Sequence, residues 1–292
     1  MAFFLEVLFN GLLVGIMYSL VALGFALIYK ASDVFNFAQG DMSLFAGLAL
    51  VGFLTVMPIW LAVICTIGVM TILAYGTVFI VFRPLVARPP LILFMAAIGL
   101  SFLIQGIGQS IWGTQPKGLF LGIPEITFDI KEVYLNTFDL TFGVVAALLL
   151  VGLVLFFQKT RTGRALRAVA DDHEAALSVG IPLLRAWAVT WVIAGIVATV
   201  AGIAWGSRLG VQFSLSLIAL KALPVLILGG IDSIPGAILA GLVVGAGENL
   251  AEVFIGPYVG GGIQTFFPYL IALIFLWFKP YGMFGKEIVE RV

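Results

Sequence analysis

Four adjacent residues, Asp171-Asp172-His173-Glu174, bring together the side-chain types that can bind a metal ion or move a proton. Either kind of chemistry needs side chains that converge on one point, and on a helix only residues three or four apart share a face. The cluster therefore predicts the solvated start of a helix rather than a catalytic centre. In that role Asp171 or Asp172 caps the first turn, where acidic groups interact favourably with the helix dipole.

The element that positions this cluster is a charged segment, residues 158–185, which lies between two apolar stretches. Such a segment has to lie in water at a membrane surface if its neighbours lie in lipid. Within it, Glu174-Ala175-Ala176 is followed after three residues by Gly180. We expect a short helix near 171–180 whose small alanines permit close docking of another protein. The helix should end at Gly180, because glycine readily turns a chain out of a helix.

The composition supports the membrane setting. Of the 292 residues, 62% are hydrophobic and 10% are charged, and the mean hydropathy is +1.18; soluble domains carry roughly 25% charged residues. Lys and Arg balance Asp and Glu at 15 each without forming a basic face, so no nucleic-acid partner is expected. The chain lacks a phosphate-binding Gly-x-x-x-x-Gly-Lys-Ser/Thr motif and a Gly-x-Ser-x-Gly elbow. We therefore expect no bound cofactor or metal and no enzyme activity of its own.

The hydrophobic pattern predicts an all-α, polytopic bundle of about 8–10 transmembrane helices in a single domain, residues 1–292. Segments of about 20 apolar residues can cross a bilayer, and in lipid a helix satisfies its own backbone hydrogen bonds. Residues 113–140 form the longest loop on the outer side and should make a small irregular cap. The apolar segments lie near 5–29, 40–57, 59–82, 91–112, 141–157, 186–206, 216–230, 234–254 and 263–279.

The basic residues predict the orientation, because cytoplasmic loops of membrane proteins are enriched in Lys and Arg. Eleven basic residues lie on the side of the 158–185 segment: Lys30, Arg83, Arg88, Lys159, Arg161, Arg164, Arg167, Arg185, Lys279, Lys286 and Arg291. Three lie on the other side: Lys117, Lys131 and Arg208. This distribution places the N-terminus outside the cell, and it places the C-terminus and residues 158–185 in the cytoplasm.

Two polar breaks interrupt the apolar pattern, at residues 29–41 and 228–236. Each follows an apolar helix, contains glycine and precedes a second helix rich in small residues. Paired interruptions predict discontinuous helices and two pseudo-repeated halves, with a transport pathway at the repeat interface. On this topology both breaks face the cytoplasm. Two ordinary turns between helices would give the same pattern, and the sequence leaves both interpretations open.

Several polar residues lie within the apolar segments. Glu248 and Glu252 share one helix face, with Asn249 beside them, and Gln105 and Gln109 have the same spacing on another helix. A carboxylate near the bilayer centre costs roughly 2.5–3.5 kcal/mol, so such residues usually face a cavity or a partner. Near a helix end the cost is smaller, and both a pathway lining and an interfacial position remain possible for the two glutamates.

These motifs together resemble the permeases of ATP-driven (ABC) importers for branched-chain amino acids, of the LivH type, over nearly the whole chain. The resemblance lies in Glu174-Ala175-Ala176 with Gly180, which is similar to the coupling motif of such permeases. It lies also in the run from Asn10 to Gly24, in Phe35-Asn36-Phe37-Ala38-Gln39-Gly40-Asp41, and in the run from Lys221 to Ala237. Where many relatives carry histidine before the glycine of the first break, this chain has Gln39.

The resemblance implies one of two permeases in the inner (plasma) membrane of a bacterium, within the lipid bilayer. Its partners would be a second, LivM-like permease, ABC ATP-binding subunits that use the ATP, and a periplasmic substrate-binding protein. The ATPase-coupling residues would be Arg164, Arg167, Glu174, Ala175, Ala176 and Gly180. The expected pathway residues are Asn36, Gln39, Asp41, Ser233, Glu248 and Asn249.

Three alternatives remain at this point. A single-chain secondary transporter would use Asp33, Asp41 or Glu248 as ion relays and would have no use for a docking helix. A multipass membrane enzyme would need clustered carboxylates or histidines at one membrane face. A permease of the same family could instead carry urea, amides or aromatic acids.

Overall fold

The computed structural model describes residues 2–86, 88–124, 126–130 and 133–285. All nine predicted apolar segments are helical, which confirms the all-α polytopic architecture. The helices of these segments are α1 (Ala2–Ser32), α2 (Gln39–Leu54), α3 (Ile59–Gly76), α4 (Pro90–Trp112), α5 (Thr137–Lys159), α8 (Leu183–Leu209), α9 (Ile218–Gly229), α10 (Ile234–Phe254) and α12 (Ile263–Phe278). The π-helix η1 (Thr77–Phe82) and the 3-10 turn η2 (Arg83–Leu85) continue α3, and the 3-10 helix η3 (Phe213–Leu217) leads into α9. Short helices fill the connections: α6 (Arg161–Asp171), α7 (His173–Ser178) and α11 (Gly256–Val259).

Six of these helical stretches are long and apolar enough to cross a membrane: 2–32, 59–85, 91–112, 137–159, 183–209 and 234–254. The stretches 39–54, 213–229 and 263–278 are apolar but shorter. Shorter helices next to the two breaks fit the expectation of discontinuous helices. Whether the chain contains two pseudo-repeated halves in one domain stays a prediction.

The chain forms two compact units, and each unit is discontinuous in sequence. Unit 1 comprises residues 1–26, 122–148 and 220–292, and unit 2 comprises residues 27–121 and 149–219. The first break and the 158–185 segment belong to unit 2, whereas the second break belongs to unit 1.

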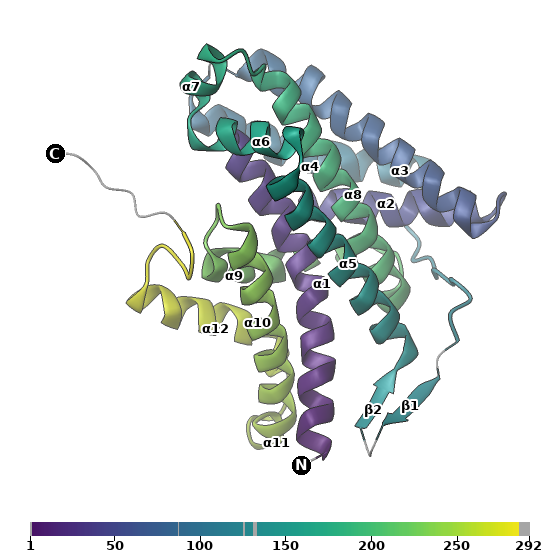
Figure 1. Ribbon diagram of the computed structural model, residues 1–292. Helices are drawn as coiled ribbons and strands as arrows, with labels where there is room; N and C mark the ends of the chain where they lie inside the picture. The colour runs from purple at the N-terminus through teal and green to yellow at the C-terminus, as the bar shows by residue number, and fades with distance from the viewer. Residues whose placement is uncertain (1, 87, 125, 131–132, 286–292) are drawn as a thin grey trace. The chain divides into compact units, whose positions relative to one another are not determined.

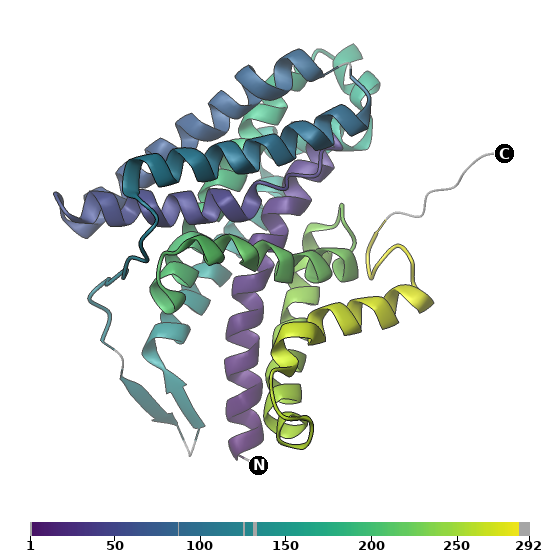
Figure 2. The same ribbon diagram turned by 180° about the vertical axis from the view of Figure 1, so that it is seen from behind.

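Unit 2 is built around α2, which contacts α3, α4 and α8 (Figure 2). Small residues allow this close packing, because Gly202 on α8 lies against the backbone of Ser43 on α2 so tightly that no side chain would fit. Large apolar side chains fill the remaining space, among them Phe82 and Trp191, whose ring centroids lie 5.0 Å apart.

Unit 1 contains the N-terminal part of α1 packed on α10 (Figure 1). Gly15 on α1 lies against the backbone of Gly241 on α10, and Gly245 lies against Gly11 and Gly15. The glycines of α10 thus allow the backbones of the two helices to approach closely. Helix α12 contacts α10 on the side where Phe267 lies against Gly247.

The loop at residues 113–140 was expected to be irregular, but it contains a small β-sheet. Residues Thr127–Ile130 (β1) and Val133–Asn136 (β2) pair as an antiparallel two-stranded sheet, with Thr127 opposite Asn136. Strand β1 alternates polar with apolar residues, and both strands contain β-branched and aromatic side chains, which favour a strand over irregular structure.

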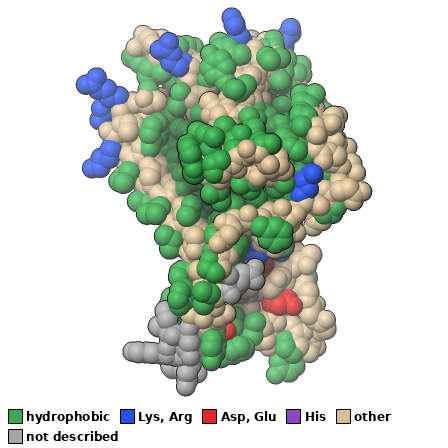
Figure 3. All heavy atoms as spheres, turned by 90° about the vertical axis from the view of Figure 1, so that its right-hand side faces the viewer, with side chains coloured by type: hydrophobic (Ala, Val, Ile, Leu, Met, Phe, Trp, Pro, Cys, Tyr) green, Lys and Arg blue, Asp and Glu red, His purple; other side chains and the backbone are tan. Residues whose placement is uncertain are grey.

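On the face shown in Figure 3, hydrophobic side chains cover much of the surface, and most Lys and Arg side chains lie toward its upper part. The orientation of the termini stays a prediction. Of the basic residues on which it rests, Lys131, Lys286 and Arg291 lie outside the described residues.

Candidate functional site

The charged segment 158–185 folds into two short helices, α6 and α7, each started by a side-chain cap. The hydroxyl of Thr160 accepts a hydrogen bond from the Gly163 amide (2.9 Å). The carboxylate of Asp172 accepts from the amides of Glu174 and Ala175, both at 2.9 Å. Of the two expected caps it is therefore Asp172 that begins the helix carrying Glu-Ala-Ala. Figure 1 shows α7 next to α6. Along the chain, α6 connects the end of α5 to α7.

Helix α7 ends in the turn expected at Gly180. Gly180 has a φ of 84°, and its amide donates to the Leu177 carbonyl while the Ile181 amide donates to the Ala176 carbonyl, both at 3.0 Å. This pair of bonds is a Schellman motif, which satisfies the last carbonyls of a helix and requires a residue in the left-handed region. A residue other than glycine would be strained there.

The outward face of α7 combines one charge with small and apolar side chains. Glu174 and Ala175 are exposed, and Leu177 and Val179 keep 52% and 73% of their surface accessible. Ala176, in contrast, is only 3% exposed, so it packs inward and positions the helix instead of offering a docking surface. Exposed apolar side chains beside a polar rim are typical of a surface that binds another protein.

The basic residues of the segment lie on α6. Arg164 and Arg167 are three apart and both exposed, while Leu166 and Val169 point inward. Gly163 fits tightly against the backbone of α5 near Phe156, so α6 folds back on the end of α5. The two guanidinium groups are thus presented on the exposed face of an amphipathic helix that contacts α7.

His173, expected to be solvated, makes a tertiary contact instead. Its Nε2 lies 3.1 Å from the carbonyl oxygen of Ala31 in the last turn of α1, and because a carbonyl only accepts, Nε2 is the donor. Its Nδ1 lies 3.8 Å from Oδ2 of Asp33. Asp33 has a φ of 52° and directly follows α1, so the start of α7 is attached to the first break.

Within the first break, two predicted pathway residues are fully buried and bonded to each other. The side-chain oxygen of Asn36 accepts from the Ala38 amide (3.1 Å), and its amide nitrogen donates to Oε1 of Gln39 (3.2 Å). Nε2 of Gln39 donates to the carbonyl of Ala194 on α8 (3.5 Å). These bonds hold the break in shape and tie the start of α2 to α8.

Asp41, the third predicted pathway residue of unit 2, forms a separate polar cluster. Its carboxylate accepts from the hydroxyl of Ser101 and from Nε2 of Gln105, the latter at 2.7 Å. Ser216 of η3 is a further polar neighbour. Asp41 is 4% exposed, so this charge is buried among neutral donors. The structure thus gives a partner to Gln105, whereas Gln109 is exposed.

In unit 1, Glu248 is buried rather than placed at an interface. It is 4% exposed, and its Oε1 accepts from the hydroxyl of Tyr18 (3.1 Å) and lies 3.4 Å from Nζ of Lys221. Nζ of Lys221 also lies 3.3 Å from the Tyr18 oxygen. Tyr18 and Lys221 were not predicted from the sequence as site residues. The available signal was a lone lysine inside an apolar segment, which needs a partner in lipid.

The remaining candidates of unit 1 have separate positions. Ser233 is buried and caps α10 by accepting from the Gly236 amide (3.1 Å). Asn249 is half-buried near Gly11. Glu252 does not join Glu248, because its carboxylate accepts from the amides of Gly262 and Gln264, each at 3.0 Å, at the start of α12. The second break therefore resembles the first in having a polar side chain that organises the start of the next helix.

Comparison with known proteins identifies the family. The model of the family described as "Branched-chain amino acid transport system / permease component" matches residues 7–277. The chain is 31% identical to the high-affinity branched-chain amino acid transport system permease protein BraD of Pseudomonas aeruginosa, covering 99% of this chain and 98% of BraD. It is 30% identical to LivH of Escherichia coli over the same shares, and 27% identical to the probable LivH of Methanocaldococcus jannaschii over 92% and 88%. This chain therefore belongs to the family of permease components of branched-chain amino acid transport systems.

Proposed function

We propose that this chain is the membrane-spanning permease subunit of an ATP-driven importer of branched-chain or other hydrophobic amino acids. The observation that carries the proposal is the exposed helix α7, which presents Glu174 and Ala175 and is attached through His173 to the first break. Family membership supports the substrate class, since BraD and LivH are named as branched-chain amino acid permeases. It also favours this function over a single-chain ion-coupled transporter.

In the proposed complex the chain works in the bacterial inner membrane with a second, LivM-like permease. A periplasmic protein delivers the amino acid, and separate ATP-binding subunits use the ATP, because this chain lacks a phosphate-binding loop. The N-terminus lies outside, and the C-terminus and α7 lie in the cytoplasm, where α7 meets the ATPase.

The proposed docking surface consists of α7 with the exposed guanidinium groups of α6. Glu174 offers a charge, Leu177 and Val179 offer apolar contact, and Ala175 keeps the approach close. Arg164 and Arg167 supply positive charge at the rim, where charges contribute to specificity and association rate more than to affinity. Ala176 and Gly180 act indirectly, by seating α7 and by ending it.

Transmission within unit 2 follows a series of contacts that begins at the first residue of α7. A shift of α7 acts through His173 on the end of α1 and on Asp33, and from there on the break that holds Asn36 and Gln39. Gln39 in turn contacts α8 at Ala194. Because Asn36 and Gln39 are fully buried, we propose that these two side chains close the pathway and that the pathway opens only when α7 moves. Asp41, Ser233, Glu248 and Asn249 are the further polar residues proposed for the pathway or its gates.

Docking is tested by co-expressing the chain with its candidate ATPases and purifying the complex in detergent. Recovery of the ATPase should be lost in Glu174→Ala combined with Gly180→Pro, and in Ala175→Trp, which blocks the approach without changing the backbone. Gln158→Ala, an exposed change outside α6 and α7, is the matched control and should keep the ATPase. ATPase recovery with every variant, or with none while the chain stays folded, would overturn the docking surface.

The substrate class is tested in proteoliposomes that contain the assembled complex and its binding protein. We expect ATP-dependent uptake of labelled leucine, isoleucine or valine. Uptake that is driven by a proton or sodium gradient without ATP would instead identify the chain as a secondary transporter. ATP-dependent uptake of urea or an aromatic acid, without uptake of leucine, would show that the proposed substrate class is wrong and that the proposed ATP-driven import is right.

A further inference from the structure

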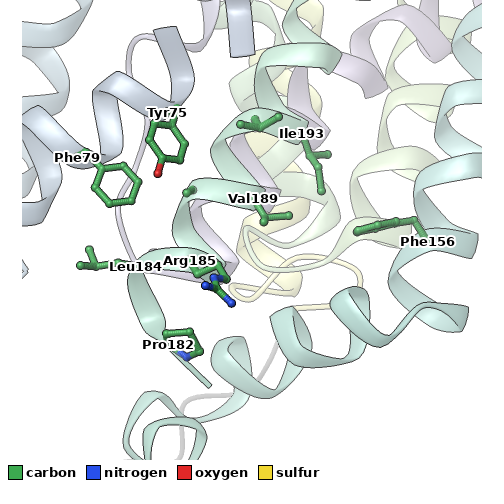
Figure 4. A pocket seen from close by; sticks show the side chains of 10 residues that line it. Tyr75, Phe79, Phe156, Pro182, Leu184, Arg185, Val189 and Ile193 are labelled. Atoms are coloured by element: carbon green, nitrogen blue, oxygen red, sulfur yellow. The ribbon is translucent and has the colours of Figure 1, made fainter. Parts of the chain in front are cut away.

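A groove lies beside the start of α8, on the surface of unit 2. Its volume is about 600 Å³, within the range of sites that hold a small molecule. Tyr75 of α3 and Phe79 of η1 form one side with their rings stacked at 4.3 Å, and Phe156 of α5 lies on the other side (Figure 4). Val189 and Ile193 of α8 line it between them. The lining is apolar except at one end, where Arg185 lies next to Pro182.

Arg185 lacks an acidic partner among the described residues, since none has a carboxylate within ion-pair distance of its guanidinium group. The residue is exposed and lies in the first turn of α8, where the helix dipole is positive and a basic side chain is unfavourable. The cap residue Pro182 adds no side-chain hydrogen bond to this end. An anion placed here would interact favourably with both the guanidinium group and the helix end, and Arg binds phosphate in a bidentate manner.

The length of the groove along α8 is close to the thickness of the hydrocarbon core of one bilayer leaflet. Arg185, Val189 and Ile193 are spaced four apart on one face of α8, so the groove follows this helix for about 12 Å. The hydrocarbon core of a leaflet is about 15 Å, half of a typical bilayer. The charged end belongs to the polar segment that ends at residue 185, and the apolar end lies within the span 183–209. The groove therefore runs from the headgroup level into the hydrocarbon.

We infer that this groove binds an anionic phospholipid, with its phosphate on Arg185 at the start of α8 and an acyl chain along Tyr75, Phe79, Val189 and Ile193. Charge complementarity selects an anionic over a zwitterionic lipid, as basic pockets between membrane helices do. The inference does not depend on the proposed transport function, because it uses only the groove, its charge and its position.

Native mass spectrometry of the full chain in detergent tests the inference, with phosphatidylglycerol and phosphatidylcholine as the two probes. Wild type should retain phosphatidylglycerol in preference to phosphatidylcholine. Arg185→Gln should weaken retention of phosphatidylglycerol about tenfold, because a charge-assisted bond is lost. Arg161→Gln, which removes an exposed charge of the same segment outside the groove, should leave retention unchanged. Equal retention of both lipids, or an equal effect of the two arginine variants, would overturn the proposal.

A second experiment locates the lipid. Phosphatidylglycerol with a photoreactive acyl chain should crosslink to residues 185–193 in wild type, and Val189→Trp, which fills the groove, should remove this product. Inorganic phosphate in excess should not compete, since it lacks the acyl chain. Competition by phosphate alone would reduce the site to an anion site. Disappearance of the crosslink once the other subunits are bound would show that a partner protein is the occupant; either result would overturn the proposal.

Discussion

His173 and Asp33 lie side by side although 139 residues separate them in the sequence, with Nδ1 of the imidazole 3.8 Å from Oδ2 of the carboxylate. Asp33 is the first residue after α1 and carries a left-handed backbone, and His173 is the first residue of α7. The exposed helix proposed to meet the ATPase is therefore attached at its first residue to the segment in which buried Asn36 and Gln39 connect the start of α2 to α8.

This contact predicts that His173→Ala uncouples ATP hydrolysis from transport. The variant keeps the exposed face of α7, so the ATPase should still co-purify. It loses the hydrogen bond to Ala31, which is worth about 1 kcal/mol, so we expect about fivefold less amino acid transported per ATP hydrolysed. His173→Gln, which retains a side-chain donor, should recover part of this coupling. Loss of ATPase binding in His173→Ala would instead make His173 part of the docking surface.

The cap at Asp172 predicts a second, separable effect. Asp172→Ala leaves two amides of α7 without their acceptor and should destabilise this short helix by about 1 kcal/mol. The fraction of folded α7 would fall, and the affinity for the ATPase should fall about fivefold with it. Asp172→Ser keeps an oxygen at the cap and should bind nearly as well as wild type. The affinities are measured by titrating purified ATPase onto the chain in nanodiscs; equal affinity for all three proteins would contradict the role of the cap.

Local features of the fold were predictable because they depend on neighbouring residues. The apolar segments, the polar breaks, the cap at Asp172 and the turn at Gly180 all follow from hydrophobic length, side-chain capping and glycine conformation. The pairing of Thr127–Ile130 with Val133–Asn136 was not predicted, because these two short strands lie in a long loop that was interpreted by its overall polarity.

The site was predictable in its residues but not in its contacts. His173 was expected in water because its partners on α1 are distant in sequence, and only tertiary packing brings them together. The same holds for Glu248, whose burial follows from the arrangement of Tyr18 and Lys221 around it. Ala176 could not be distinguished from Ala175 by type, since both are alanines and only the side on which α7 packs separates them.

The packing of α1 on α10 predicts that Gly245→Val prevents folding of unit 1. A side chain at this position would overlap the backbone of Gly11 and Gly15, which cannot give way as a flexible side chain could. We expect most of the variant to be lost as aggregate on size-exclusion chromatography. Gly152→Ala is the matched control, since a methyl group there meets no neighbouring atom, and it should be recovered like wild type. A monodisperse Gly245→Val protein would contradict the close helix contact.

The pair of buried Glu248 and half-buried Lys221 predicts an asymmetric pattern of stabilities. Lys221→Met leaves a buried carboxylate without its cation; this loss costs about 3–5 kcal/mol in a fully buried pair and less here, because water reaches part of the Lys221 side chain. Combining Lys221→Met with Glu248→Gln removes both charges while the side-chain volumes stay similar, so most of the loss should be recovered. Thermal unfolding in detergent measures this as a melting temperature that falls in the single variant and rises again in the double variant. A double variant less stable than Lys221→Met would show that the two residues contribute independently, and the pair would then have no role in holding α9 and α10 together.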